Sequence, residues 1–210
     1  MADLRERGPD LLEIMQSLID ANLAAVMTSI PVKVVKDSDG HTVSLQPLIK
    51  SVFRQPDGSD KLVEFPVIQD APVKFASGGG HTFTHPVKEN DEGMALVSMR
   101  SMDNWHQQGG VQQPNDARMH DLSDSIYIPG VRSDKRKLEK VSTTSAQFRT
   151  DDGDSVVDVS GKGVVTSRKN SVVTVDDTGI ETKRNSSAVK VTDSSVKTKA
   201  SKVLLNCNDL

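Results

Sequence analysis

Apolar and polar residues alternate along the C-terminal third of the chain in a pattern that returns every sixteen residues. The segment Ser155–Val159 reappears as Ser171–Val175 and again as Ser187–Val191, and the second half of each unit repeats in the same way. Self-similarity at a fixed period is typical of solenoids and stacked arrays. Because the local period is two, each unit is predicted to form two short strands, joined by turns that contain Gly and Asp.

These repeats carry few large apolar residues. Burial of one aliphatic side chain contributes roughly 1.5 to 3 kcal/mol, whereas ordering the backbone costs ~1 to 2 kcal/mol per residue. Winding several copies of the chain together encloses the valines and pairs the strand edges. We therefore predict an intertwined trimeric β-helix over residues 134–210, with a single-chain solenoid as the alternative. The predicted trimer core consists of Val157, Val159, Val164, Val173, Val175, Ile180, Val189, Val191, Val196 and Leu205.

The first two thirds of the chain have a different pattern. Pro9 suits a first helical turn, and a broad apolar face up to Val26 predicts a helix that packs on its own domain or a symmetry mate, or else on another assembly protein. Short strands are predicted at residues 30–35, 41–45, 62–68, 72–76, 81–87, 94–99 and 126–128. So many short strands in roughly 100 residues indicate an OB-like barrel and a mainly β fold.

Three regions follow from these patterns. Residues 1–29 form an N-terminal arm and helix, residues 30–133 form the OB-like domain, and residues 134–210 form the β-helical shaft with the C-terminal end. The polar stretch from Ser101 to Asp124 is expected to be a loop that packs Trp105 onto the barrel.

Composition agrees with a chain that ends in a thin, self-associating rod. Hydrophobic residues make up 35% of its 210 residues and aromatic residues 3%. Residues 1–133 contain 12 basic and 18 acidic residues, and residues 134–210 contain 14 and 11. Neither imbalance indicates nucleic-acid binding, which on an OB barrel needs aromatic platforms and a basic groove. Without an apolar run of ~20 residues or a signal peptide, the product is expected to be soluble and made in the cytoplasm.

The sequence offers little catalytic chemistry. His81 and His85 would lie on one face of a strand but about 13 Å apart, too far for both to bind one metal ion. His106 and His120 lack partners at ligand spacing, and the lone Cys207 is a minor candidate for a metal or redox role at a trimer axis. No G-x-S-x-G motif marks a nucleophile. We predict a protein that is not an enzyme and has no catalytic residue, metal site or cofactor.

A set of short motifs in the first two thirds of the chain carries a family resemblance. The motifs are Phe65-Pro66-Val67, Ala71-Pro72-Val73, Gly78-Gly79-Gly80, Pro86-Val87, Asp91-Glu92-Gly93, Asp103-Asn104-Trp105 and the run from His120 to Gly130. Over about residues 25–133 they resemble the N-terminal domain of the central baseplate spike of contractile-tailed bacteriophages. The stretch from Asp121-Leu122-Ser123-Asp124 to Pro129-Gly130 is the most specific part of the match.

The resemblance implies a virion protein of the tail baseplate, with an OB-like domain followed by a three-chain β-helix. In that role it caps the tail tube and perforates the host outer membrane during contractile tail ejection. The implied partners are two further copies, a baseplate hub protein at the N-terminal side and, transiently, the membrane, with no nucleic acid.

The C-terminal end departs from this family. Its members often end in an apex where His-x-His pairs bind iron, but this chain has no histidine after His120, so the iron site is not carried over. A separate small tip protein is expected to cover the end at Leu204 and Leu205.

Two other functions remain as alternatives. The first is a nucleic-acid-binding OB protein with an oligomerising tail, and the second is a tail enzyme that degrades the cell envelope. A contractile injection device related to phages would use the same architecture.

Overall fold

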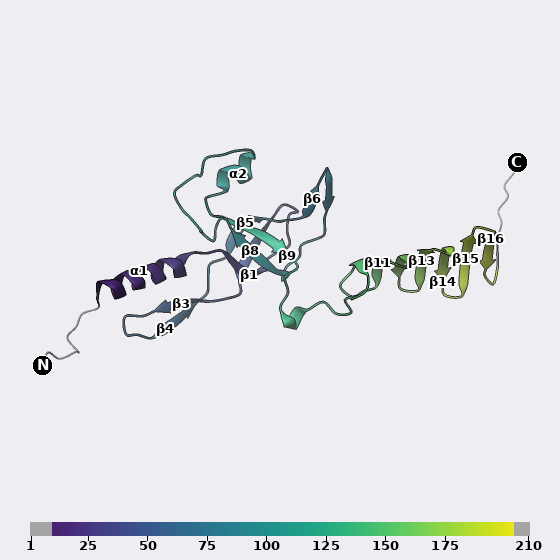
Figure 1. The fold of residues 1–210 in the computed structure, drawn as a ribbon, viewed down its shortest axis with the longest axis horizontal. Helices are drawn as coiled ribbons and strands as arrows, with labels where there is room; N and C mark the ends of the chain where they lie inside the picture. The colour runs from purple at the N-terminus through teal and green to yellow at the C-terminus, as the bar shows by residue number, and fades with distance from the viewer. Residues whose placement is uncertain (1–9, 204–210) are drawn as a thin grey trace. The chain divides into compact units, whose positions relative to one another are not determined.

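A computed structural model describes residues 10–203, which divide into two compact units, one up to Lys135 and one from Arg136 onward (Figure 1). Leu205, the last residue of the predicted trimer core, lies outside the described residues, as do Leu204 and Cys207. No helix among the described residues is long and apolar enough to cross a membrane.

The first unit begins with helix α1, Leu11–Ala25. Asp10 is its N-cap, and the carboxylate of Glu13 accepts a hydrogen bond of 3.3 Å from the backbone N–H of Asp10, so the sequence encodes the start of the helix. Every residue of α1 is exposed. In the chain by itself α1 therefore does not pack on its own domain, and its packing on a symmetry mate or on another assembly protein stays a prediction.

Five strands of the first unit form a nearly closed, barrel-like sheet in the order β5-β2-β1-β8-β9, with every neighbouring pair antiparallel. A parallel bridge between Val73 and Tyr127 brings the chain just after β5 against β9, and the N–H of Lys74 donates to the carbonyl of Tyr127 at 2.9 Å. The strands are β1 (Ser29–Val34), β2 (Thr42–Pro47), β5 (Ile68–Pro72), β8 (Glu92–Val97) and β9 (Ser125–Pro129).

Side chains that alternate along these strands fill the barrel. Along β1, Ile30, Val32 and Val34 point inward and are buried. Leu45 of β2 and Tyr127 of β9 are fully enclosed, and the hydroxyl of Tyr127 donates to the carbonyl of Glu92 at 3.2 Å. Burial raises the pKa of Tyr127 to about 12, which keeps this hydroxyl protonated as a donor.

Two hairpins extend the first unit, and they account for most differences from the predicted strands. The hairpins pair β3 (Ser51–Arg54) with β4 (Asp60–Val63) and β6 (Ala76–Gly78) with β7 (His81–Phe83). The single strand predicted at residues 62–68 is wrong, because β4 ends at Val63 and β5 begins at Ile68, with Pro66 between them unable to donate a ladder hydrogen bond. The strands predicted at 72–76 and 81–87 are likewise shorter or divided.

The loop predicted between Ser101 and Asp124 contains a short helix, α2 (Asp103–Gln108). Trp105 lies in α2 and keeps 49% of its surface exposed, so the prediction that it packs onto the barrel is wrong. The core cluster of the barrel does not include it.

We predict that Gly93→Ala destabilises the barrel by about 1 to 3 kcal/mol, as overpacking of a core typically does. A Cβ at Gly93 would overlap the ring of Tyr127 and come within 2.5 Å of the carbonyl oxygen of Ile128. Thermal unfolding of the full chain measures the change. Gly78→Ala is the matched control, because its Cβ would meet no atom within 4 Å. Equal melting temperatures for the two variants would contradict the prediction.

The second unit is one seven-stranded antiparallel sheet in which every strand pairs with the next, as the ladder of arrows in Figure 1 shows. After a short 3-10 turn at Asp134–Arg136, the strands are β10 (Ala146–Arg149), β11 (Ser155–Ser160), β12 (Gly163–Arg168), β13 (Ser171–Asp176), β14 (Gly179–Arg184), β15 (Ser187–Thr192) and β16 (Ser195–Lys199). Each sixteen-residue unit therefore forms two strands, as predicted. Because consecutive strands pair antiparallel, this sheet is not the single-chain solenoid weighed as an alternative, whose successive coils stack in parallel.

Candidate assembly interface

The register of the repeat sheet places one row of aliphatic side chains across six strands. Each member of this row stands directly opposite the next on the neighbouring strand. We name this row the aliphatic column, and it consists of Val159, Val164, Val175, Ile180, Val191 and Val196. Cross-strand pairs of β-branched residues stabilise a sheet, so the aliphatic column stabilises the observed pairing register of the strands.

Two more rows share this face of the sheet. In the middle row, Val157, Val173 and Val189 alternate with threonines at 166, 182 and 198. The third row alternates serine and arginine, and Arg168 and Arg184 each donate from Nη1 to a serine Oγ on the preceding strand, at 2.6 and 3.0 Å. We call the three rows together the valine face. Its apolar part is a strip bordered by a polar edge.

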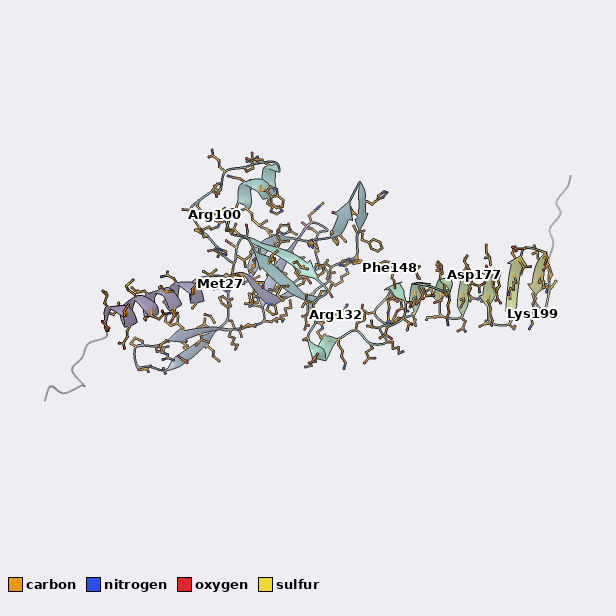
Figure 2. All side chains as sticks on the ribbon, in the orientation of Figure 1. Met27, Arg100, Arg132, Phe148, Asp177 and Lys199 are labelled. Atoms are coloured by element: carbon orange, nitrogen blue, oxygen red, sulfur yellow. The ribbon has the colours of Figure 1, made fainter. Side chains whose placement is uncertain are left out.

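The valine face is open in the chain by itself. The nine described residues of the predicted trimer core all lie on it, since strand alternation sends them to the same side. Their exposed fractions run from 37% for Val157 to 69% for Val196. Figure 2 labels Phe148 on the first strand of the repeat sheet and Lys199 on the last. Contiguous exposed aliphatic side chains of this kind are typical of interaction surfaces.

Two-residue turns keep successive strands in this register. Lys169 and Asn185 occupy the first turn position with φ of 50° and 51°, the left-handed conformation that such hairpin turns require. Gly179, with φ of 135°, lies so close to the carbonyl of Val191 that no side chain fits. In the intervening turn, the hydroxyl and N–H of Thr178 donate to Asp176 at 2.7 Å, and these bonds lower the pKa of the Asp176 carboxyl.

The opposite face of the repeat sheet mixes polar residues with aliphatic ones, among them Val156, Val165 and Val172, and its polar residues change along the sheet. Near β10, Ser145 and Gln147 each donate a hydrogen bond of 2.6 Å to the carboxylate of Asp158, which lowers the pKa of that group. Near β16, lysine side chains occupy this face instead.

Sequence reasoning found the aliphatic residues of the valine face but missed its polar rows. Arg168 and Arg184 are sixteen residues apart, as are Ser155 and Ser171, so the repeat contained the information. The register was needed to show that each arginine faces a serine on the neighbouring strand.

In the barrel unit, the motif that carries the family resemblance contains a buried aspartate at the centre of a hydrogen-bond network. Asp124 is 1% exposed, and its carboxylate accepts hydrogen bonds from Nε and Nη2 of Arg118 at 2.6 and 2.9 Å and from the N–H of Met102 at 2.9 Å. Arg118 also donates to Asp103 at 2.6 Å and to Asp116 at 2.8 Å. The pKa of Arg118 is raised, first by Asp124 and then by Asp103, so the network stays charged. It ties α2 and its loop to β9.

The histidines are dispersed in the barrel unit. His85 packs edge-on against Phe75 with ring centroids 5.3 Å apart, and Nδ1 of His120 lies 3.1 Å from the carbonyl of Met27. Within residues 10–203, no group of three or more His, Cys, Asp or Glu side chains is arranged to hold a metal ion.

Comparison with known proteins supports the phage origin that the sequence motifs imply. Residues 30–130 match the family model described as the phage protein Gp138 N-terminal domain. The matched segment begins in β1 and ends just after β9, so it spans the whole barrel and just under half of the chain. A search of the curated proteins found no match for the chain. The barrel is thus similar to a domain of a phage protein, and this supports a structural protein of the phage particle.

Proposed function

We propose that the protein is the homotrimeric central spike of a contractile tail baseplate. Three chains pack their valine faces around a common axis and form a shaft, and the barrels cap the tail tube. The shaft perforates the host outer membrane when the tail contracts. The open valine face is the observation that carries this proposal, and the match of residues 30–130 to a phage protein domain supports its setting.

The composition of the valine face supports a trimer rather than a dimer. A sandwich of two such sheets would lay the serine–arginine row against a second sheet and bury Arg168 and Arg184, which is costly for guanidinium groups whose hydrogen-bond partners in this row are serine hydroxyls. In a three-sided shaft, the apolar strips meet inside while the arginine row lies at a corner where the guanidinium groups reach water. This arrangement is a three-sided trimeric shaft with one repeat sheet on each side, and because the strands of each sheet pair within one chain, the chains pack side by side rather than intertwine strand by strand.

The barrel supports the OB-like part of the proposal. Its strand order is that of a five-stranded Greek-key barrel, in which β8 crosses to pair with β1 and the chain beyond β5 closes against β9. We infer an OB-type domain that docks to a baseplate hub protein on the N-terminal side, where α1 exposes its apolar residues. A small tip protein covers the other end of the shaft.

Perforation needs stiffness and no bond chemistry. A shaft whose backbone groups are paired and whose valines are enclosed carries an axial load without local unfolding. The role is therefore mechanical, with no catalytic residue and no cofactor.

Light scattering of the purified full chain tests the trimer directly. We expect three times the chain mass of 22.8 kDa, unchanged on dilution. A particle of 22.8 kDa that keeps its β signal would overturn the proposal. Single-stranded DNA added to the same sample is expected to leave the scattering mass unchanged, which separates a spike from a nucleic-acid-binding OB protein.

A further inference from the structure

Charge is divided along the repeat sheet. Residues 146–178, from β10 to the turn after β13, contain four basic and six acidic residues, whereas residues 179–203 contain six basic and two acidic residues. The net charge thus changes from −2 to +4 within one sheet, and a trimer would triple both values.

The register gathers the positive charge on the face opposite to the valine face. Ala188 of β15 stands between Lys183 of β14 and Lys199 of β16, and the next row contains Lys190 opposite Lys197. Neighbouring strands are ~4.8 Å apart and same-face residues along a strand ~7 Å apart, so four ammonium groups share a small area. We name Lys183, Lys190, Lys197 and Lys199 the lysine patch.

The lysine patch is only partly neutralised by its surroundings, and Lys190 lies close enough to Asp176 to help lower the pKa of that carboxyl. None of its four side chains forms an ion pair with any part of the chain that the structure describes, although Glu181 stands opposite Lys190 in the register. Lys183, Lys197 and Lys199 are exposed. Like charges directly opposite each other destabilise a sheet, so the pair Lys190 and Lys197 lowers the stability of β15 and β16. Elsewhere in the sheet, Lys169 pairs with Asp154 at 3.5 Å.

We propose that the lysine patch binds the anionic headgroups of a lipid membrane surface. The patch belongs to the last three strands described, at the end of the sheet far from the barrel in the sequence, and it deepens the proposed function because it would hold the advancing shaft to the membrane that it perforates. Clustered lysines near a surface bind anionic lipids through the electrostatic potential of the headgroups, without a fixed geometry. Binding falls with salt, since the Debye length is ~10 Å at 0.1 M and ~3 Å at 1 M.

The chemistry of the patch favours lipid phosphates over nucleic acid. Single-stranded nucleic acid is held by aromatic side chains that stack on the bases as well as by basic residues. From β11 to β16 the sheet contains no aromatic residue. Lysine provides a point charge for phosphate rather than the bidentate fork of arginine, which suits a disordered array of headgroups.

Vesicle flotation of the full chain tests the proposal. The probes are vesicles of phosphatidylglycerol with phosphatidylcholine, vesicles of phosphatidylcholine alone, and single-stranded DNA. We expect flotation with the anionic vesicles at 0.1 M salt, loss of flotation at 0.5 M salt, and none with neutral vesicles. The variant with Lys183→Gln, Lys190→Gln, Lys197→Gln and Lys199→Gln is expected to bind anionic vesicles at least about tenfold more weakly.

A matched control carries the same loss of charge elsewhere. Lys36, Lys61, Lys135 and Lys137 are exposed, and their replacement by glutamine is expected to leave flotation unchanged. Equal loss in both variants, unchanged flotation of the patch variant, or preference of the wild-type chain for DNA over vesicles would each overturn the proposal.

Light scattering on the same samples separates this proposal from the trimer. A patch variant that keeps its oligomeric mass while losing flotation supports the lipid contact. If the wild-type chain proves monomeric and still floats through these lysines, the spike proposal fails and the lipid contact stands.

Discussion

Val175→Asp is expected to reduce the mass of the particle from that of three chains to that of one. Val175 lies within the aliphatic column, opposite Val164 and Ile180, and keeps 44% of its surface exposed in the chain by itself. In the proposed trimer this surface would be covered, and three carboxylates would be enclosed together without partners. Each costs several kcal/mol to desolvate, and their mutual repulsion adds to that cost. Light scattering measures the mass.

Val172→Asp is the control for this substitution. Val172 belongs to the same strand, β13, but lies on the opposite face, where its register neighbours are Ser167 and Lys183. Val172 is partly exposed, and a carboxylate there would face a lysine outside the proposed interface, so the mass of three chains is expected to persist. A trimeric Val175→Asp protein would show that the valine face is not the interface.

Asp124→Ala is expected to destabilise the barrel unit by about 3 to 5 kcal/mol, the usual cost of removing one partner from a buried ion pair. The substitution leaves the N–H of Met102 without its acceptor and removes two of the hydrogen bonds made by Arg118. For a domain of this size we expect the melting temperature to fall by about 10 °C or more. Fluorescence of Trp105, the only tryptophan, reports on the barrel unit during thermal unfolding.

Asp116→Ala tests whether the burial of a carboxylate, rather than its charge alone, determines how much it stabilises this network. Asp116 also bonds to Arg118, at 2.8 Å, but its side chain is 46% exposed. Water replaces an exposed partner at little cost, so we expect a loss of less than about 1 kcal/mol. Equal melting temperatures for the two alanine variants would show that Asp124 does not stabilise the barrel unit more than Asp116 does.

The repeat could be predicted from the sequence because its information is local. Apolar residues at Val157 and Val159, with a polar residue between them, predict a strand and the face on which its apolar side chains lie. The sixteen-residue period extends this prediction from one unit to the next. The start of α1 was equally local, with Asp10 and Glu13 in a capping arrangement. The number of chains that share the valine face depends on surfaces that meet only on assembly, and it stays a prediction.

The barrel was predicted less well because its decisive contacts are distant in sequence. Arg118 and Asp103 are fifteen residues apart in a polar stretch, and the sequence of such a stretch predicts a loop rather than an ion pair across it. Hairpin β3–β4 was missed because its strands are short and its apolar residues, such as Val52 and Phe53, remain exposed. The split between β4 and β5 followed from a single proline, whose missing N–H outweighed the apolar run around it.

The sixteen-residue register makes the length of this sheet adjustable in fixed steps. An in-frame duplication of one unit, such as residues 171–186, adds two strands, about 9 to 10 Å of sheet, and returns every valine to its side. An insertion of eight residues, which is half a unit, would instead turn the valines of the inserted strand to the opposite face of the sheet. The reason is that the valine-face positions are odd-numbered in β13 and even-numbered in β14. Whole repeats can therefore be gained or lost without changing the composition of the valine face.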